Sequence, residues 1–215
     1  MIQAHYEKVK KACGEQARLC VVSKKRSKEE IMSYYDAGER IFGENHAQEL
    51  LGKIDLPADI QWQFIGHLQR NKVKSIVPYV SCIQSLDSLE LAKEIDKQCA
   101  KLNKTMDVLC EFHMADEDGN KSGHDPADAD AFVRSCMQFA HLNVCGIMAM
   151  GPHTNDTERI RDVFMKTHAL YVHLQSLYGA SQIHTLSMGM SSDYEIALAC
   201  GSNMVRVGTY LFKED

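Results

Sequence analysis

Long apolar runs, paired cysteines and the common metal motifs are all absent from this 215-residue sequence. Because no run reaches 18 apolar residues and the charged N-terminal segment lacks an apolar core, we expect neither a membrane span nor a signal peptide. The eight cysteines form no CxxC pair, and the ten histidines form neither HxH nor HExxH. These absences argue against a disulfide framework and against a metal site. We expect a cytoplasmic protein whose cysteines are buried free thiols.

A large excess of charge is also missing, since 24 basic residues face 29 acidic ones, for a net charge of −5. This balance argues against a nucleic-acid-binding protein. Two short basic runs, residues 24–28 and 70–74, are interpreted as solvated helix faces, although small anions also favour such places. With 45% hydrophobic residues and no linker or repeat, the sequence predicts one globular domain over residues 1–215.

Short apolar runs alternate with helical patterns along the whole sequence. The runs are continuous rather than alternating, which is typical of strands buried on both faces of a parallel sheet. Between them, apolar residues recur at helical spacing from Ala47 to Ile54 and from Ile160 to Leu177. The predicted strands are residues 19–23, 40–43, 61–66, 81–85, 107–112, 143–150, 182–188 and 203–208.

Capping residues mark several helix starts. Ser27 and Ser192 each stand three residues before a glutamate, which is the spacing of a capping box. Asp87 stands in the same relation to Glu90. Asp125 precedes a proline, a residue favoured at the first position of a helix. These positions predict helices that begin close behind the strands.

Eight strand–helix units in one domain predict a (β/α)8 TIM barrel, compact beside the ~250 residues typical of this fold. The last predicted strand leaves only residues 209–215 behind it, so a full eighth helix is missing. We expect residues 3–17 to cover the gap. A doubly wound parallel sheet is the alternative, but eight parallel strands without a GxGxxG motif make it weaker.

The segments after the seventh and eighth predicted strands are rich in glycine and hydroxyl groups. In a TIM barrel the active site lies at the carboxyl ends of the strands, and phosphate commonly binds after strands 7 and 8. Residues 187–192 lead into a helix start, where free N–H groups favour an anion, and Gly208 lets the backbone approach a ligand. The alternative is that Gly189 and Gly208 only shape turns and Ser192 only caps a helix. The position on the barrel favours a phosphate site.

Lys24 directly follows the first predicted strand, which points to the barrel mouth and to surroundings of low dielectric. Desolvation lowers the pKa of a lysine, and an uncharged amine can form a Schiff base with an aldehyde. The alternative is a surface lysine that keeps its charge in water. Together with a phosphate site, Lys24 indicates a ligand with an aldehyde and a phosphate, as in pyridoxal 5′-phosphate. Arg206 could then donate to the pyridine nitrogen without giving it a full proton.

Other strand ends carry polar candidates for the same site. Glu44 and Asn45 follow the second strand, and His67 and Gln69 follow the third, where loop hydrogen bonding and ligand contact are equally good interpretations. Methionines 148, 150, 188 and 190 are interpreted as core or rim filler. Residues 121–123 are interpreted as a surface turn, with anion contact as the lesser option.

Six phrases in this sequence resemble the pyridoxal phosphate homeostasis protein family. They follow one another in the family's order from about Leu19 to Phe212, and those around strands 2, 3, 7 and 8 are specific. The resemblance implies a single-domain barrel like the N-terminal domain of alanine racemase, with pyridoxal phosphate on a lysine. The phrases are VVSKK, IFGENHAQEL, WQFIGHLQRNK, GIMAM, TLSMGMSSDYEIAL and GSNMVRVGTYLF.

By motif, the resemblance implies that Lys24 is the Schiff-base lysine and that Arg206 is the partner of the pyridine nitrogen. It also implies that the phosphate is held by residues after the last two strands and that an asparagine lies at the rim of the pocket. These residues are Ser191, Gly208 and Thr209 for the phosphate, and Asn45 for the rim. The sequence departs from the family at residues 25–27, at Lys213 and in its missing closing helix, which bears on the stability of the barrel rim.

Three functions remain open at this point. The first is a carrier that holds or delivers pyridoxal phosphate, possible recipients being apo-enzymes that depend on it. The second is an amino-acid racemase, which needs a second acid–base group opposite the lysine, and nothing in the sequence places Tyr210 or another tyrosine there. The third is a cofactor-free aldolase, for which Glu44 or Glu111 would supply the acid–base group. The sequence favours the carrier, as a monomer without robust turnover.

Overall fold

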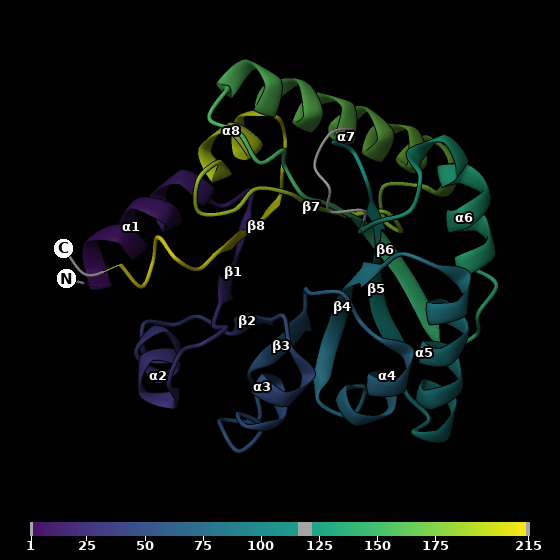
Figure 1. The fold of residues 1–215 in the computed structure, drawn as a ribbon, viewed down its shortest axis with the longest axis horizontal. Helices are drawn as coiled ribbons and strands as arrows, with labels where there is room; N and C mark the ends of the chain where they lie inside the picture. Colours follow the sequence, from purple (N-terminus) through teal and green to yellow (C-terminus); the bar gives the residue numbers. More distant parts are fainter. Residues whose placement is uncertain (1, 116–121, 214–215) are drawn as a thin grey trace.

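Eight parallel strands close into a barrel in the computed structural model, which describes residues 2–115 and 122–213 (Figure 1). Each strand pairs with the next, and β1 pairs with β8 to close the ring. All eight predicted strands are present in the predicted order, with ends that differ by at most three residues, so the TIM barrel is confirmed. The strands are β1 (Arg18–Val22), β2 (Ile41–Glu44), β3 (Gln61–Phe64), β4 (Val80–Leu86), β5 (Met106–Phe112), β6 (Leu142–Ala149), β7 (Thr185–Ser187) and β8 (Met204–Val207).

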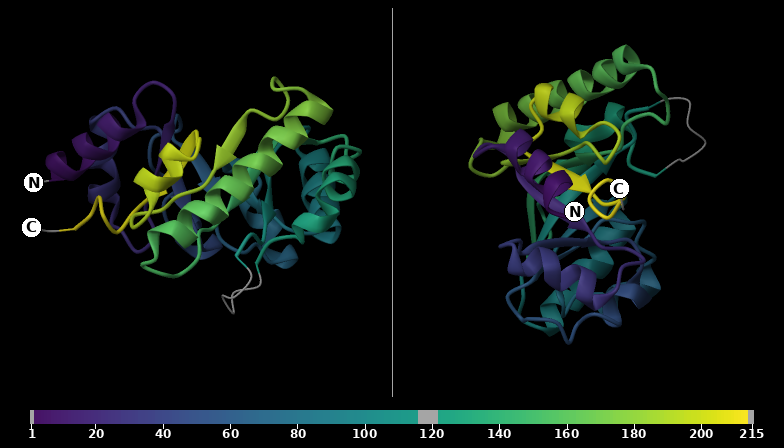
Figure 2. Two further views of the ribbon diagram at one scale, coloured as in Figure 1. Left: turned by 90° about the horizontal axis from the view of Figure 1, so that it is seen from above. Right: turned by 90° about the vertical axis from the view of Figure 1, so that its left-hand side faces the viewer.

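Helices surround the barrel and connect its strands (Figures 1 and 2). Within the described part of the chain, no helix is long and apolar enough to cross a membrane. The helices are α1 (Ile2–Cys13), α2 (Lys28–Asp36), α3 (Ala47–Leu51), α4 (Arg70–Ile76), α5 (Leu89–Lys101), the 3₁₀ turn η1 (Pro126–Asp128), α6 (Ala129–Cys136), α7 (Thr157–Tyr178) and α8 (Tyr194–Ala199).

Apolar side chains fill the layer between strands and helices, whereas the barrel interior is mixed. Strand residues such as Val21, Phe42 and Trp62 belong to the large core that includes the inner helix faces. The interior holds a smaller apolar cluster of Cys82, Leu109, Cys145 and Met148, together with buried polar residues. All eight cysteines are buried free thiols, as predicted. The polar part of this interior lies beneath the site described below.

The side of the barrel next to the segment that follows β8 is covered by α1, as predicted. After β8 the chain makes only turns as far as Lys213. The His5 and Tyr210 rings lie 4.6 Å apart, so α1 packs beside the segment that follows β8 (Figure 2). The Tyr34 hydroxyl donates to the carbonyl of Leu211 over 2.6 Å, and its ring contacts Phe212. These contacts hold the barrel rim after β8.

Several local predictions need correction. The capping box at Ser27 is present, and Asp125 caps η1 rather than an α-helix. Ser192 and Asp87 are not caps, because α8 and α5 begin one residue later than predicted, at N-caps Asp193 and Ser88. The apolar ends of the two predicted helical faces are exposed, Ile54 by 38% and Leu177 by 48%. Ile54 lies beyond the end of α3, and Leu177 lies in the last turn of α7.

Candidate functional site

A pocket of about 680 Å³ opens at the carboxyl ends of the strands. Its walls come from the segments after β1, β2, β3, β6, β7 and β8, which a closed parallel barrel brings to one rim. All six residues predicted from the sequence line it, namely Lys24, Asn45, Ser191, Arg206, Gly208 and Thr209. Residues spread over more than 180 positions thus line one pocket, and their role in binding a ligand stays a prediction.

Lys24 lies in a tight turn at the pocket rim. The N–H of Arg26 donates to the carbonyl of Ser23 over 3.1 Å, which closes a turn around Lys24 and Lys25. Lys25 has a φ of 59°, in the left-handed region that side chains other than glycine seldom adopt. Lys24 is exposed. The low-dielectric surroundings predicted for it are therefore wrong, because the turn leaves the side chain open to solvent at the pocket rim.

A buried ion pair holds the residue before Lys24. Glu44 is fully buried and Lys53 is only 7% exposed, and their side chains lie 2.7 Å apart. The Ser23 hydroxyl donates to the same carboxylate over 2.7 Å, and Lys53 Nζ donates to the carbonyl of Ser23 over 2.8 Å. Burial raises the pKa of Glu44, against the lowering effect of its bonds from Lys53 and Ser23. Glu44 is thus occupied as a structural partner of the turn.

Backbone N–H groups converge on Ser191 at the opposite wall. The N–H groups of Gly208 and Tyr210 each donate to Ser191 Oγ over 3.2 Å. A Cβ on Gly208 would lie 2.9 Å from the carbonyl oxygen of Val22, so this close approach of β8 to β1 requires glycine. Gly189 requires glycine for another reason, a φ of +95° with Ala197 in the way of a side chain. Hydroxyl and amide donors therefore meet where the phosphate site was predicted.

The first turn of α8 is less suited to an anion than expected. Its N-cap Asp193 makes no side-chain cap bond, and its carboxylate instead accepts the N–H of Met190 over 2.5 Å. Asp193 is buried, and burial raises the pKa of its carboxyl group. The donors that face the pocket thus come from the loops rather than from the helix dipole.

Arg206 is 4% exposed and rises from β8 into the pocket floor. Its Nη1 donates to the carbonyl and hydroxyl oxygens of Ser187 over 2.9 and 2.6 Å, and its Nη2 donates to the carbonyl of Ala149 over 3.0 Å. Burial lowers the pKa of the guanidinium. An arginine nevertheless stays protonated, so Arg206 offers only donors to a ligand.

Asn45 carries an unsatisfied polar atom into the site. Its Oδ1 is buried and has no hydrogen-bond partner among the described residues. A buried amide oxygen without a partner costs about 1–3 kcal/mol, so it favours a ligand that supplies a donor. The backbone of Asn45 packs closely against Gly66. A Cβ added to Gly66 would lie 2.4 Å from the carbonyl oxygen of Asn45.

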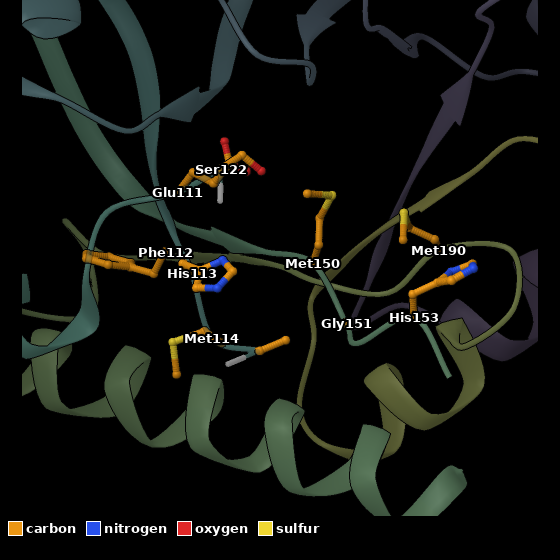
Figure 3. A pocket seen from close by; sticks show the side chains of 10 residues that line it. Glu111, Phe112, His113, Met114, Ser122, Met150, Gly151, His153 and Met190 are labelled. Atoms are coloured by element: carbon orange, nitrogen blue, oxygen red, sulfur yellow. The ribbon is translucent and has the colours of Figure 1, made fainter. Parts of the chain in front are cut away.

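Two further hollows adjoin this pocket. One, of about 460 Å³, shares Met150 and Met190 with it, and Figure 3 shows Glu111 and Ser122 on one side of Met150 with Met190 and His153 on the other. Burial raises the pKa of Glu111 there. The other, of about 440 Å³, shares Asn45 and His46 with the main pocket and is also lined by His67, Gln69 and Lys72. Of residues 121–123, Lys121 lies outside the described residues.

Besides Lys24 and Lys25, the described lining of the main pocket offers one histidine, His46, for acid–base chemistry. Among the described residues that line it, there is no aspartate, glutamate or tyrosine. Glu44 is buried beneath it and Glu111 lines the neighbouring hollow. No group of three histidine, cysteine or acidic side chains suited to a metal occurs within residues 2–115 and 122–213.

The sequence missed the residues that support the site from below, namely Gln63, Gln84, Ser187 and Lys53. Gln63 and Gln84 stand inside apolar strand runs, QWQF and SCIQS, and such polar interruptions were the available signal. Once a barrel is assumed, side-chain alternation along each strand assigns them to the interior.

The chain is similar in sequence to known proteins. The model of the alanine racemase N-terminal domain matches residues 1–215. The pyridoxal phosphate homeostasis protein of Aquifex aeolicus is 38% identical over 216 residues, which cover 97% of this chain and 94% of that protein. The protein of the same name from Escherichia coli K12 is 33% identical, with coverages of 93% and 88%.

Solved structures agree with the sequence comparison. PipY of Synechococcus elongatus without PLP has a TM-score of 0.92 at 32% identity and is matched over 99% of this chain and 100% of its own. PipY with PLP bound has a TM-score of 0.90 at 30% identity, with the same coverages. An alanine racemase of Clostridium difficile has a TM-score of 0.81 at 12% identity, over 56% of its own length, which is a likeness of fold alone.

Proposed function

Since the chain belongs to the pyridoxal phosphate homeostasis protein family, we propose that it binds pyridoxal 5′-phosphate in the pocket of Lys24 and acts in intracellular vitamin B6 homeostasis. The observation that carries the proposal is the meeting of Lys24, the Ser191 loop and Arg206 in one pocket. Support comes from PipY, whose similar barrel has PLP bound.

Each part of the pocket suits one part of the cofactor. When bound, the cofactor supplies an aldehyde that a lysine amine can capture covalently, and Lys24 is the lysine at the rim that fills this role. Ser191, Gly208 and Thr209 hold the phosphate through hydroxyl and backbone donors. Arg206 donates to the ring nitrogen from the pocket floor. Asn45 gains a partner for its buried amide at the rim.

The same geometry favours holding and release over turnover. Lys24 is exposed, so the cofactor can enter and leave without opening the barrel. Racemisation needs a second acid–base group opposite the lysine, and the described lining of the pocket carries no tyrosine or carboxylate for it. The histidine of the lining, His46, follows β2, which is the neighbour of the strand that Lys24 follows. The aldolase alternative also lacks its carboxylate in this described lining. We therefore favour a carrier that passes the cofactor to apo-enzymes and works as a monomer.

The direct test is covalent trapping. The purified protein is incubated with pyridoxal phosphate, its visible absorption is recorded, and borohydride followed by peptide mass mapping locates the fixed adduct. We expect the adduct on Lys24, its loss in Lys24→Ala, and its retention in the neighbouring control Lys25→Ala. A protein that takes up no cofactor, or an adduct mainly on another lysine, contradicts the proposal. A racemase assay and light scattering on the loaded protein then test the carrier and monomer assignments.

A further inference from the structure

The barrel interior beneath Arg206 contains three polar side chains that the proposed function does not use. They are Ser187 on β7, Gln84 on β4 and Gln63 on β3, and all three are buried. Branched apolar residues dominate the interior of most TIM barrels, and burying polar groups costs free energy unless they are hydrogen-bonded. The three residues are bonded to one another and to Arg206, so they form one unit.

The bonds in this unit run in a single direction. Arg206 Nη1 donates to Ser187 Oγ over 2.6 Å, Ser187 Oγ donates to Gln84 Oε1 over 2.7 Å, and Gln84 Nε2 donates to Gln63 Oε1. An arginine has no acceptor, so the Ser187 hydroxyl must accept from it and must place its own proton elsewhere. Gln84 Oε1 takes that proton, and the Gln84 amide is kept in this orientation because its Nε2 finds Gln63 Oε1 and lies 3.2 Å from Met204 Sδ.

We propose that Ser187, Gln84 and Gln63 are positioning residues that fix the guanidinium of Arg206 toward the ring nitrogen of bound pyridoxal phosphate. This inference rests on the function proposed above. Three N–H groups of the guanidinium are held by Ser187 and Ala149. A guanidinium has five N–H donors and Arg206 lines the pocket, so the donors that do not take part in these three bonds can serve a ligand.

The unit also affects the charge of the ring, together with the titratable groups that interact with Arg206, namely Cys20, Glu111 and Asp193. A fixed guanidinium beside the ring nitrogen donates a hydrogen bond and, through its positive charge, opposes protonation of that nitrogen. If the hydrogen bonds of the unit are removed, the Ser187 hydroxyl no longer has a fixed orientation. Its hydrogen bond from Arg206 Nη1 is then weakened or lost. Water can then reach the nitrogen, which gains a proton as the pH falls. The unit therefore affects both the affinity for the cofactor and the pH dependence of its visible absorption.

The test compares full-length variants by equilibrium binding of pyridoxal phosphate and by absorption of the bound cofactor from pH 5 to pH 8. Ser187→Ala removes one oxygen, and Gln84→Met keeps the side-chain volume but removes both bonds. Each should bind about tenfold more weakly, and each should show a larger pH-dependent absorption change than the original protein. The contribution of Glu111, whose raised pKa and interaction with Arg206 are common to all variants, cancels in this comparison. Gln84→Glu keeps the acceptor for Ser187, and Gln63 can turn its amide to donate, so this variant should bind within about threefold of the original.

Two controls separate the explanations. Gln98→Met alters a buried glutamine of α5 outside the barrel interior and should change neither readout. Original affinity and an unchanged pH profile in both Ser187→Ala and Gln84→Met would overturn the inference, as would equal loss in Gln84→Glu and Gln84→Met. Borohydride trapping on Lys24 is measured in every variant. Its failure in the unaltered protein refutes the proposed function itself, whereas trapping that persists in a weakened variant supports the positioning role.

Discussion

Lys53 Nζ lies 2.8 Å from the carbonyl oxygen of Ser23, the residue immediately before Lys24. The same ammonium pairs with the buried carboxylate of Glu44, which also accepts from the Ser23 hydroxyl. A buried charge pair therefore fixes the backbone from which the exposed Lys24 side chain extends. The reach of that side chain into the pocket depends on this support.

We predict that Lys53→Met strongly destabilises the protein, because it leaves Glu44 buried without its counter-charge. Removing one partner of a buried pair costs about 3–5 kcal/mol. The double variant Lys53→Met, Glu44→Gln removes both charges and should recover most of that loss. Denaturant unfolding measures the stabilities, and borohydride trapping shows whether Lys24 still captures the cofactor in the double variant. Equal instability of the single and double variants would refute the role of the ion pair.

Gly189 and Gly179 offer a matched comparison. Both have φ near +90°, but a Cβ on Gly189 would lie 2.5 Å from Ala197 Cβ, whereas on Gly179 it would meet only Ser181 Oγ at 3.9 Å. Gly179→Ala should therefore cost about 1–3 kcal/mol from backbone strain alone, because its φ of 90° and ψ of 145° are adopted essentially only by glycine. Gly189→Ala should cost more, by about 1–3 kcal/mol of overpacking, and should weaken cofactor binding through the adjoining Ser191 loop. Thermal unfolding and binding titration of the two variants check both parts.

Glu111 gives a prediction for pH dependence. Burial raises its pKa in the folded protein above the ordinary value of 4.5. The folded state therefore holds this proton more tightly than the unfolded chain does, so the contribution to stability is fully present below pH 4.5 and is lost as the pH rises through the folded-state pKa. The variant Glu111→Gln has no carboxyl group at this position, so it does not lose this stability as the pH rises.

The stability of Glu111→Gln relative to the original protein should thus increase from pH 4.5 toward pH 8. Chemical denaturation across this range measures the difference. Burial also raises the pKa values of Glu44 and Asp193. Both residues are present in the variant and in the original protein, so their effects on stability cancel when the two proteins are compared. A difference in stability that is constant with pH would show that burial does not raise the pKa of Glu111.

The end of the barrel rim is tested by Tyr34→Phe. This change removes the 2.6 Å bond to the carbonyl of Leu211 and keeps the ring that packs on Phe212. We expect a loss of about 1–2 kcal/mol, since a buried carbonyl loses its donor. Tyr35→Phe, which removes a surface bond to Asp59, serves as control and should be nearly neutral. If the two variants are equally stable, the turn after β8 does not depend on Tyr34.

The barrel and the composition of its site could be predicted because both follow from simple patterns. Continuous apolar runs mark strands buried on both faces, and the barrel rule places their carboxyl ends together, so Lys24 and Arg206 were assigned to one rim although 182 positions separate them. The prediction that Ser192 is the N-cap of α8 is wrong, because Asp193, an equally good cap residue, stands next to it and takes the N-cap position.

The exposure of Lys24 and the polar unit under Arg206 could not be predicted in the same way. The exposure of Lys24 depends on the turn at Lys25, whose φ of 59° is unusual for lysine and leaves no pattern in the sequence. The contact of Ser187 with Gln84 crosses the barrel between strands that are not neighbours. Such a contact depends on the closed ring and on side-chain length, which local periodicity does not encode.

The pairing of β1 with β8 brings together the parts of the chain that are farthest apart among the strands, with Val21 opposite Val207. Lys24 follows one of these strands, and Arg206 and Gly208 belong to or follow the other. A ligand held by both sides bridges the seam at which the barrel closes. Because such a ligand binds only the closed ring, it should slow opening at this seam. It should also raise the unfolding temperature with the logarithm of its free concentration, and this rise should continue after the site is saturated.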